Sequence, residues 1–186
     1  MKRFPLILII FILVPTLAVA QEYLQRSVRD SLTKAYYTMQ AIILAAGMGR
    51  RLGELTDDNT KCMLKVNGTR LIHRTLDNLA EVGIKRVVLV VGYKAENVKR
   101  LIGDRYKDID IVYVENKIYD KTNNIYSLFL AREYLLERDS LLLESDLIFE
   151  SSVLRKIVEN RYPNIALVDK YESWMDGTAR KYPRSR

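Results

Sequence analysis

Two glycines separated by one residue follow an apolar run in the 186-residue chain, and two arginines come directly after them. The segment, residues 41–52, is Ala-Ile-Ile-Leu-Ala-Ala-Gly-Met-Gly-Arg-Arg-Leu. A buried strand that ends in a glycine turn can bring backbone N–H groups close to an anion, because glycine has no Cβ in the way. The arginines add fixed positive charge and forked donors for phosphate oxygens. The segment therefore predicts a binding site for a phosphorylated ligand.

Two common glycine loops fit this segment poorly. The dinucleotide-binding fingerprint requires a third glycine three residues after Gly49, where the chain has Leu52. A Walker loop requires Gly-Lys-Ser/Thr after four intervening residues, and the segment does not contain it. A strand-to-loop turn with incidental glycines is the simplest alternative, and the residues further along the chain weigh against it.

Three later segments, together with this one, resemble the motifs of a known protein family. Residues 60–68 are Thr-Lys-Cys-Met-Leu-Lys-Val-Asn-Gly, residues 123–128 are Asn-Asn-Ile-Tyr-Ser-Leu and residues 142–146 are Leu-Leu-Glu-Ser-Asp. The set resembles the sugar-phosphate and choline-phosphate nucleotidyltransferases, most of all their phosphocholine cytidylyltransferase branch, from residue 40 to about residue 177. The family has Pro-Lys where this chain has Thr60 and Lys61.

The resemblance implies that a nucleoside triphosphate, CTP in the cytidylyltransferase branch, transfers its nucleotidyl group to phosphocholine or a similar phosphorylated small molecule and releases pyrophosphate. In-line attack of one phosphate on another brings two anions together, so catalysis consists mainly of positioning and charge neutralisation. By position in the family motif, Arg51 would hold the departing pyrophosphate and Lys61 would bridge the reacting phosphates. The residues expected to cradle the nucleotide at the end of the first strand are Leu44, Ala45, Ala46, Gly47 and Gly49.

Asp146 is the candidate Mg²⁺ ligand. Residues 140–146 read as a buried strand whose carboxylates come at its C-terminal end, where open α/β sheets place ligands. An aspartate there can hold Mg²⁺ against phosphate oxygens with few other protein ligands. Glu144 is a second choice for the same ion, and capping of a helix that begins near Ser151 is the alternative role for Asp146.

The Asn123-Asn124 pair precedes a helical pattern of apolar residues, and asparagine is a good helix N-cap, so one of the two is expected to cap that helix. The family resemblance places this segment near the nucleobase and the ribose. Asn124 and Ser127 are therefore predicted nucleotide contacts. Gly92 and Tyr93, at the end of an expected strand, would line the same cleft or only make a turn.

The only tryptophan, Trp174, lies close in sequence to Tyr171 and to two carboxylates. Such a mixture can hold a quaternary ammonium group by cation–π attraction, which favours phosphocholine over a sugar phosphate as the acceptor. Packing of the aromatic side chain on the edge of the sheet is the alternative. His73, the sole histidine, is expected at the surface or half-buried, and the single cysteine, Cys62, excludes an intrachain disulfide.

Strand-like and helix-like patterns alternate along the chain, which predicts an α/β domain with a mostly parallel sheet and helices on both faces. The resemblance implies the same architecture, a Rossmann-like nucleotidyltransferase fold. The expected strands are 41–45, 87–91, 109–114, 141–143 and 165–168. The expected helices are 71–82, 95–102, 125–136 and 153–159.

The composition is that of a globular protein, with 48% hydrophobic and 28% charged residues. The formal net charge of +7 suits anionic ligands. The lysines and arginines are scattered instead of forming one run, so no nucleic-acid partner is expected. The expected partners are a nucleoside triphosphate and a phosphorylated small molecule.

Residues 1–38 lie outside the alternating pattern. Lys2 and Arg3 precede an apolar run, and residues 18–20 form an Ala-x-Ala site, as in a secretory signal peptide. As a helix, residues 4–20 would span about 25 Å, less than a hydrocarbon core of about 30 Å. Export would separate an enzyme from its nucleoside triphosphate, and family members commonly begin at the first strand. We therefore expect residues 1–38 to come from an upstream start codon or to anchor a cytoplasmic catalytic domain to a membrane.

Residues 39–178 are expected to form the nucleotidyltransferase domain, and residues 179–186 a basic tail. The resembling enzymes run considerably further and carry their second metal-binding aspartate in the additional portion, so the domain is expected to be incomplete at its C-terminus. Two rival interpretations stay open. One is a sugar-1-phosphate nucleotidyltransferase, and the other is a truncated remnant that binds a nucleotide without turnover.

Overall fold

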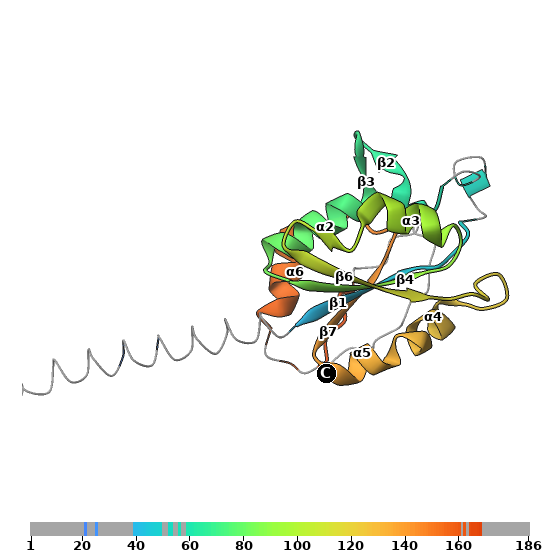
Figure 1. Cartoon of the computed structure of the whole chain (residues 1–186). Coiled ribbons are helices and arrows are strands. Elements are labelled where there is room, and N and C mark those ends of the chain that lie inside the picture. The colour runs from blue at the N-terminus through green and yellow to red at the C-terminus, as the bar shows by residue number, and fades with distance from the viewer. Residues whose placement is uncertain are drawn as a thin grey trace, which may run out of the picture.

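The computed structural model describes residues 21, 25, 39–49, 52–53, 56, 59–160, 162 and 164–168. These residues form a five-stranded sheet, helices and a separate two-stranded hairpin (Figure 1). In this part of the chain no helix is long and apolar enough to cross a membrane. The predictions for Arg51, Tyr171, Trp174 and the segments 4–20 and 179–186 lie outside the described residues.

Four parallel strands make up most of the sheet: β1 (Gln40–Ala45), β4 (Arg86–Val91), β6 (Ile109–Glu115) and β7 (Ser140–Glu144). A short antiparallel strand, β5 (Arg105–Tyr106), pairs with β6 at one edge, and the spatial order is β5-β6-β4-β1-β7. The chain moves outward from β1 to β6 and then returns to place β7 on the other side of β1. Strand order therefore reverses between β1 and β7, where open α/β sheets bind ligands at the carboxyl ends of the strands.

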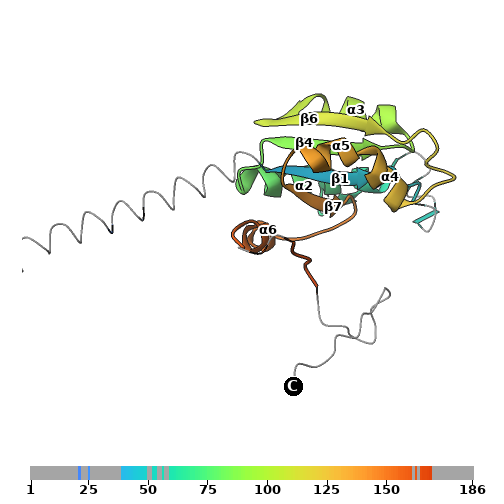
Figure 2. The ribbon, with the colours of Figure 1, turned by 90° about the horizontal axis from the view of Figure 1, so that it is seen from below.

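Helices cover both faces of this sheet, which confirms the predicted α/β architecture. One face carries α2 (Leu71–Glu81), α3 (Ala95–Ile102) and α6 (Ser151–Val158). The other carries α4 (Asn124–Leu130) and α5 (Arg132–Glu137), which lie in front of the strands in Figure 2.

β1 lies within the sheet and is buried on both faces. Ala41, Ile43 and Ala45 belong to the core cluster of α2, α3 and α6, whereas Ile42 and Leu44 belong to the cluster under α4 and α5. A strand that is buried on both faces reads as a continuous apolar run instead of an alternating one. The observed ends of β1, β4 and β7 accordingly lie within one residue of the predicted ends.

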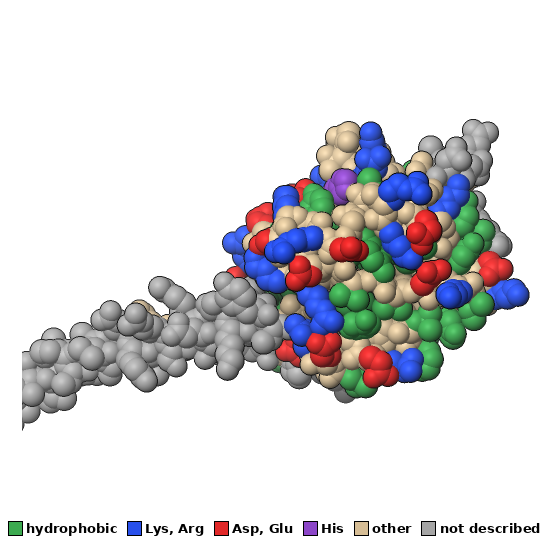
Figure 3. Space-filling view, in the orientation of Figure 1, with side chains coloured by type: hydrophobic (Ala, Val, Ile, Leu, Met, Phe, Trp, Pro, Cys, Tyr) green, Lys and Arg blue, Asp and Glu red, His purple; other side chains and the backbone are tan. Residues whose placement is uncertain are grey.

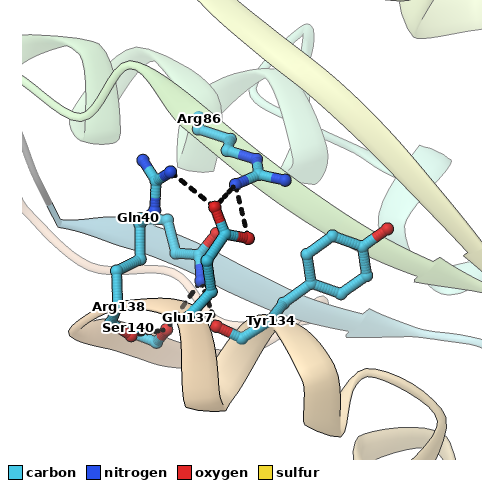
Figure 4. Close-up of polar contacts among 6 residues, drawn as sticks. All are labelled: Gln40, Arg86, Tyr134, Glu137, Arg138 and Ser140. Atoms are coloured by element: carbon cyan, nitrogen blue, oxygen red, sulfur yellow. Dashed lines mark hydrogen bonds and ion pairs between the residues drawn. The ribbon is translucent and has the colours of Figure 1, made fainter.

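A polar network joins the amino-terminal ends of the strands to α5 (Figure 4). The buried Gln40 side chain donates from Nε2 to the Tyr134 carbonyl oxygen at 2.6 Å and to Ser140 Oγ at 3.1 Å. The Arg86 guanidinium donates to both carboxylate oxygens of Glu137, at 2.7 and 2.9 Å. These contacts fix α5 against β1, β4 and β7 at the end of the sheet opposite to their carboxyl ends.

The prediction of one helix over 125–136 is wrong. Two helices occupy this stretch and meet at Ala131, whose N–H donates to the Leu128 carbonyl oxygen at 3.0 Å, one residue short of α-helical spacing. Ala131 is fully buried in the cluster under α4 and α5. The division therefore accompanies close packing on the sheet and not a glycine or proline.

The prediction of a strand over 165–168 is also wrong. This stretch has no regular secondary structure, and the Leu167 and Val168 side chains are 65% and 64% exposed. A strand needs a neighbour for its backbone hydrogen bonds. Within the described ranges, no strand lies alongside these residues, so the apolar run alone does not form one.

A hairpin that the sequence analysis did not predict follows the glycine-rich segment. β2 (Lys65–Val66) and β3 (Thr69–Arg70) are joined by Asn67 and Gly68, which have φ of 51° and 79°. Asn-Gly with positive φ at both positions is typical of a type I′ turn, whose twist matches that of the strands that it joins.

Candidate functional site

The glycine turn follows β1 at the carboxyl end of the sheet. Ala46 is buried, and its carbonyl oxygen accepts from the Tyr93 N–H at 3.1 Å. A Cβ on Gly92 would lie 2.8 Å from that oxygen and 2.8 Å from Tyr119 Cβ. Glycine at position 92 therefore permits the close approach of the two strand ends, which fixes the start of the turn against the end of β4.

Gly49 lies against the side chain of Lys61. Its φ is +67°, and a Cβ built there would be 2.8 Å from Lys61 Cγ and 2.9 Å from Thr56 Cγ2. A larger residue would combine a strained backbone with displacement of the lysine stem. An added Cβ on Gly47, in contrast, would meet no atom of the described residues within 4 Å. The second glycine of the motif thus fits the lysine, whereas the first has no such close neighbour among them.

Lys61 and Asp146 are 85 residues apart in sequence and in contact in the structure. Lys61 begins a single 3₁₀ turn, η2 (Lys61–Met63), and its Nζ donates to Asp146 Oδ2 at 3.0 Å. Asp146 follows β7, so the contact lies beside the reversal of strand order. The two side chains are 35% and 42% exposed, which leaves them accessible to a ligand. Two of the three predicted charged site residues are therefore brought together, and the third, Arg51, lies outside the described residues.

The two adjacent asparagines at the start of α4 have different partners. Asn123 is the N-cap, and its Oδ1 accepts from the Tyr126 N–H at 3.2 Å. This contact confirms that one of the pair caps the helix. Asn124 reaches the end of β7 instead, where its Nδ2 donates to both carboxylate oxygens of Glu144 at 3.0 Å each.

The charges of Lys61 and Asp146 both act on the carboxyl group of Glu144. Burial is the largest cause of the raised pKa of this carboxyl, and the negative charge of Asp146 raises that pKa further. The hydrogen bond from Asn124 and the positive charge of Lys61 act in the opposite direction. The four side chains therefore form one electrostatic group at the carboxyl ends of the strands.

Ser127 is only 3% exposed, and its hydroxyl oxygen accepts from Asn116 Nδ2 at 3.1 Å. Asn116 directly follows β6 and is 1% exposed. Its backbone N–H donates to the Val91 carbonyl oxygen at 2.8 Å. Its side-chain Nδ2 also donates to Thr122 Oγ1 at 2.9 Å. The sequence analysis missed Asn116, although a polar residue directly after a buried strand is a recognisable signal. In the structure the Ser127 hydroxyl supports the loop before Asn124, and its contact with a nucleotide stays a prediction.

Asp146 fits the role of a Mg²⁺ ligand. Mg²⁺ keeps several of its waters and is commonly held by one or two carboxylates plus substrate phosphates. Asp146 is an exposed carboxylate at a strand end, with Glu144 two residues before it. Among the residues that the structure describes, no group of three or more His, Cys, Asp or Glu side chains is placed to hold a metal ion. Magnesium binding at Asp146, with Glu144 as second choice, stays a prediction.

Comparison with known proteins now gives the family. Residues 41–175 match the MobA-like NTP transferase domain. The chain belongs to this family. This match confirms the predicted nucleotidyltransferase family. The likeness to the solved CTP transferase from T. maritima confirms the Rossmann-like fold.

Relatives of this NTP transferase domain include the CMP-5'-(3-aminopropyl)phosphonate synthase of Streptomyces rubellomurinus, 44% identical over 119 residues, which are 64% of this chain and 19% of that protein. The choline-phosphate cytidylyltransferase of Haemophilus influenzae is 30% identical over 138 residues, 74% of this chain and 57% of that protein. The structure of the inositol-1-phosphate CTP transferase from T. maritima matches with a TM-score of 0.53 and 32% identity, over 66% of this chain and 49% of that one. The chain thus spans about half the length, or less, of these proteins.

Proposed function

We propose that this NTP transferase domain is a Mg²⁺-dependent cytidylyltransferase. It binds CTP and transfers the CMP group to a small phosphorylated acceptor that carries a positively charged nitrogen, phosphocholine or a close analogue, with release of pyrophosphate. The observation that carries the proposal is the contact between Lys61 and Asp146 beside the glycine turn. The pair supplies a cation for phosphate oxygens and a carboxylate for the metal at one position.

Lys61 suits the reacting phosphates. The attacking phosphate and the α-phosphate of CTP repel each other, and an ammonium group between them stabilises the crowded transition state more than the separated reactants. Asp146 holds Lys61 Nζ at 3.0 Å, and Gly49 fits the lysine stem, so the ammonium is already placed at the site. When bound, Mg²⁺ would add positive charge against phosphate oxygens, with Asp146 as its protein ligand.

Support for CTP and for the acceptor comes from the relatives. The names of the Streptomyces, Haemophilus and T. maritima proteins specify CMP, cytidylyl transfer and CTP respectively. Two of these three names also specify a molecule with a nitrogen at the end of a short carbon chain, aminopropylphosphonate and choline phosphate. These two names support a cationic acceptor, whereas the T. maritima name specifies inositol-1-phosphate, which has no nitrogen.

Pyrophosphate release tests the proposal. With the full chain, Mg²⁺, CTP and phosphocholine, we expect release above that with CTP alone and above that with UTP and glucose 1-phosphate, the rival pair. Lys61→Ala should lower turnover by about 10²–10³-fold, because its charge acts mainly in the transition state. Lys65→Ala is the matched control, since Lys65 is an exposed lysine on β2, and it should keep wild-type turnover.

Calorimetry separates the proposal from the remnant interpretation. CTP binding without turnover, unchanged by added phosphocholine, would mean that the chain is a nucleotide-binding remnant and that the catalytic proposal is wrong. A wild-type chain that binds no nucleotide would contradict the proposal altogether.

A further inference from the structure

Glu115 and Glu144, the glutamates that end β6 and β7, have different partners. At the end of β6, Glu115 accepts from the ammonium group of Lys99 at 3.2 Å. The Glu144 carboxylate forms no such ion pair within the described part of the chain. It is held there by the neutral amide of Asn124, at 3.0 Å to each of its oxygens.

A carboxylate without a cationic partner is unfavourable at this depth. Glu144 is half-buried, and the carboxylate of Asp146 follows it by two residues. Removal of an ionised carboxylate from water costs free energy unless a positive partner replaces the lost solvation. A ligand that brings a positive charge to Glu144 would supply this partner.

We propose that Glu144, oriented by Asn124, binds the positively charged nitrogen of the acceptor. The inference rests on the proposed cytidylyltransferase function and names the residue that sets its acceptor class. The Nδ2 atom of Asn124 is engaged by the carboxylate, so the pair offers acceptor oxygens to a ligand. Such a surface favours a cation or an N–H donor and disfavours a second phosphate.

The position of Glu144 fits a short acceptor. The reacting phosphates would lie at Lys61 and Asp146. Asp146 follows Glu144 by two residues, in the turn after β7. An acceptor with only a few carbon atoms between its nitrogen and its phosphorus suits two groups that lie so close along the chain.

Two parts of the nucleotide fit this position less well. The cytosine base and the ribose hydroxyls are neutral, so either would leave the carboxylate without a compensating charge.

Acceptor binding tests the assignment. Calorimetry with the full chain, Mg²⁺ and a non-hydrolysable CTP analogue compares phosphocholine, phosphoethanolamine and ethyl phosphate, which has the phosphate without the nitrogen. We expect the wild type to bind the two cationic acceptors about tenfold or more tightly than ethyl phosphate, the effect of one charge-assisted contact. Glu144→Gln keeps the size of the side chain and should abolish this preference by weakening the cationic acceptors alone.

Three further variants sharpen the test. Asn124→Ala should reduce the preference in part, because the carboxylate loses its orienting amide. Glu144→Asp keeps the charge and should retain part of the preference. Glu115→Gln is the matched control, since Glu115 ends the neighbouring strand β6 with a lysine already bound, and it should keep the wild-type preference.

The outcomes separate this inference from the proposed function. If the CTP analogue binds but the wild type shows no preference for cationic acceptors, or binds no acceptor, the assignment of Glu144 is wrong and the nucleotide site stands. The same holds if Glu144→Gln leaves the preference unchanged, and a loss of CTP-analogue affinity in that variant would then place Glu144 at the Mg²⁺ ion or the ribose. Failure of the analogue to bind the wild type would refute the proposed function and this inference together.

Discussion

At the scale of single residues, the site depends on a glycine that fits a lysine. Gly49 combines positive φ with a lysine carbon 2.8 Å from the position that a Cβ would occupy. Gly68 in the β2–β3 turn also has positive φ, +79°, but a Cβ there would meet no atom of the described residues within 4 Å. Comparison of the two positions therefore separates backbone strain from displacement of Lys61.

Gly49→Ala and Gly68→Ala are each expected to lower the free energy of unfolding by about 1–2 kcal/mol, because alanine is strained at positive φ. Only Gly49→Ala should also lower turnover, since the added methyl group displaces the Lys61 stem. Urea unfolding and pyrophosphate release measure the two effects. Equal turnover in both variants would show that the position of Lys61 does not depend on Gly49.

Cys62, next to Lys61, gives a prediction about pH. The thiol is buried, and burial raises its pKa from 9.0 to about 11. The folded protein therefore keeps the thiol protonated while the unfolded chain ionises it, so stability is full below about pH 9 and falls as the pH rises towards 11. Each unit of displacement corresponds to about 1.4 kcal/mol.

Urea unfolding across this alkaline range checks the effect of Cys62. Cys62→Ala should flatten the decline of the free energy of unfolding. A residual decline is expected from Tyr106 and Tyr113, because burial raises the pKa of each phenol to about 12. Identical pH profiles for the wild type and the variant would mean that the thiol does not contribute.

At the scale of elements, the sequence was sufficient where burial alone sets the structure. β1 and β4 are buried on both faces, so their bounds follow from the apolar runs. The division of α4 from α5 at Ala131 could not be predicted in this way, because alanine is the best helix former and only its packing on the sheet marks the position. The β2–β3 hairpin has a recognisable Asn-Gly turn, but strands of two residues are too short to show alternation.

The candidate site shows the same limit. The motifs were sufficient to predict Lys61 and Asp146, and the structure brings them into contact. The hydrogen bonds from Asn124 to Glu144 could not be predicted, because either of two adjacent asparagines can cap a helix. The path of the chain into α4 decides which asparagine is the N-cap, and Asn116 helps to fix that path.

Asn116 is a positioning residue in the loop between β6 and α4. Its side chain forms hydrogen bonds with Thr122 Oγ1, Ser127 Oγ and the Ile118 N–H. Asn116→Ala should cost about 1–3 kcal/mol of stability, because it leaves buried polar groups without partners. It should also raise the KM of a cationic acceptor more than it lowers kcat, since the loop leads into Asn124, which holds the Glu144 carboxylate.

Steady-state kinetics and urea unfolding check both effects of the Asn116 variant. Thr122→Ala removes only one of the three side-chain hydrogen bonds and should have a smaller effect of the same kind. If Asn116→Ala lost stability but kept the wild-type KM, its role would be structural only.

At the scale of the whole molecule, the polar network around Gln40 and the candidate ligand-binding groups lie at opposite ends of the sheet. The network of Gln40 and Arg86 closes the amino-terminal end of the strands (Figure 4), whereas Lys61, Glu144 and Asp146 lie at the carboxyl ends. On the face drawn in Figure 3, basic and acidic side chains are interspersed.

Variants at one end of the sheet should lower stability without changing ligand affinity, and a variant at the other end should lower affinity without lowering stability. Gln40→Met keeps the length of a fully buried side chain but removes the donor to Tyr134 and Ser140. The Gln40 Oε1 atom has no hydrogen-bond partner within the described part of the chain. Removal of this buried unpaired atom offsets part of the stability lost with the two hydrogen bonds. We therefore expect the free energy of unfolding to fall by about 1 kcal/mol, with unchanged ligand affinities. Glu144→Gln removes a half-buried charge that has no cationic partner there, so its stability should stay the same or rise while its affinity for cationic acceptors falls. Urea unfolding and calorimetry on both variants measure this contrast, and parallel losses of stability and affinity in both would show that the two ends of the sheet are not independent.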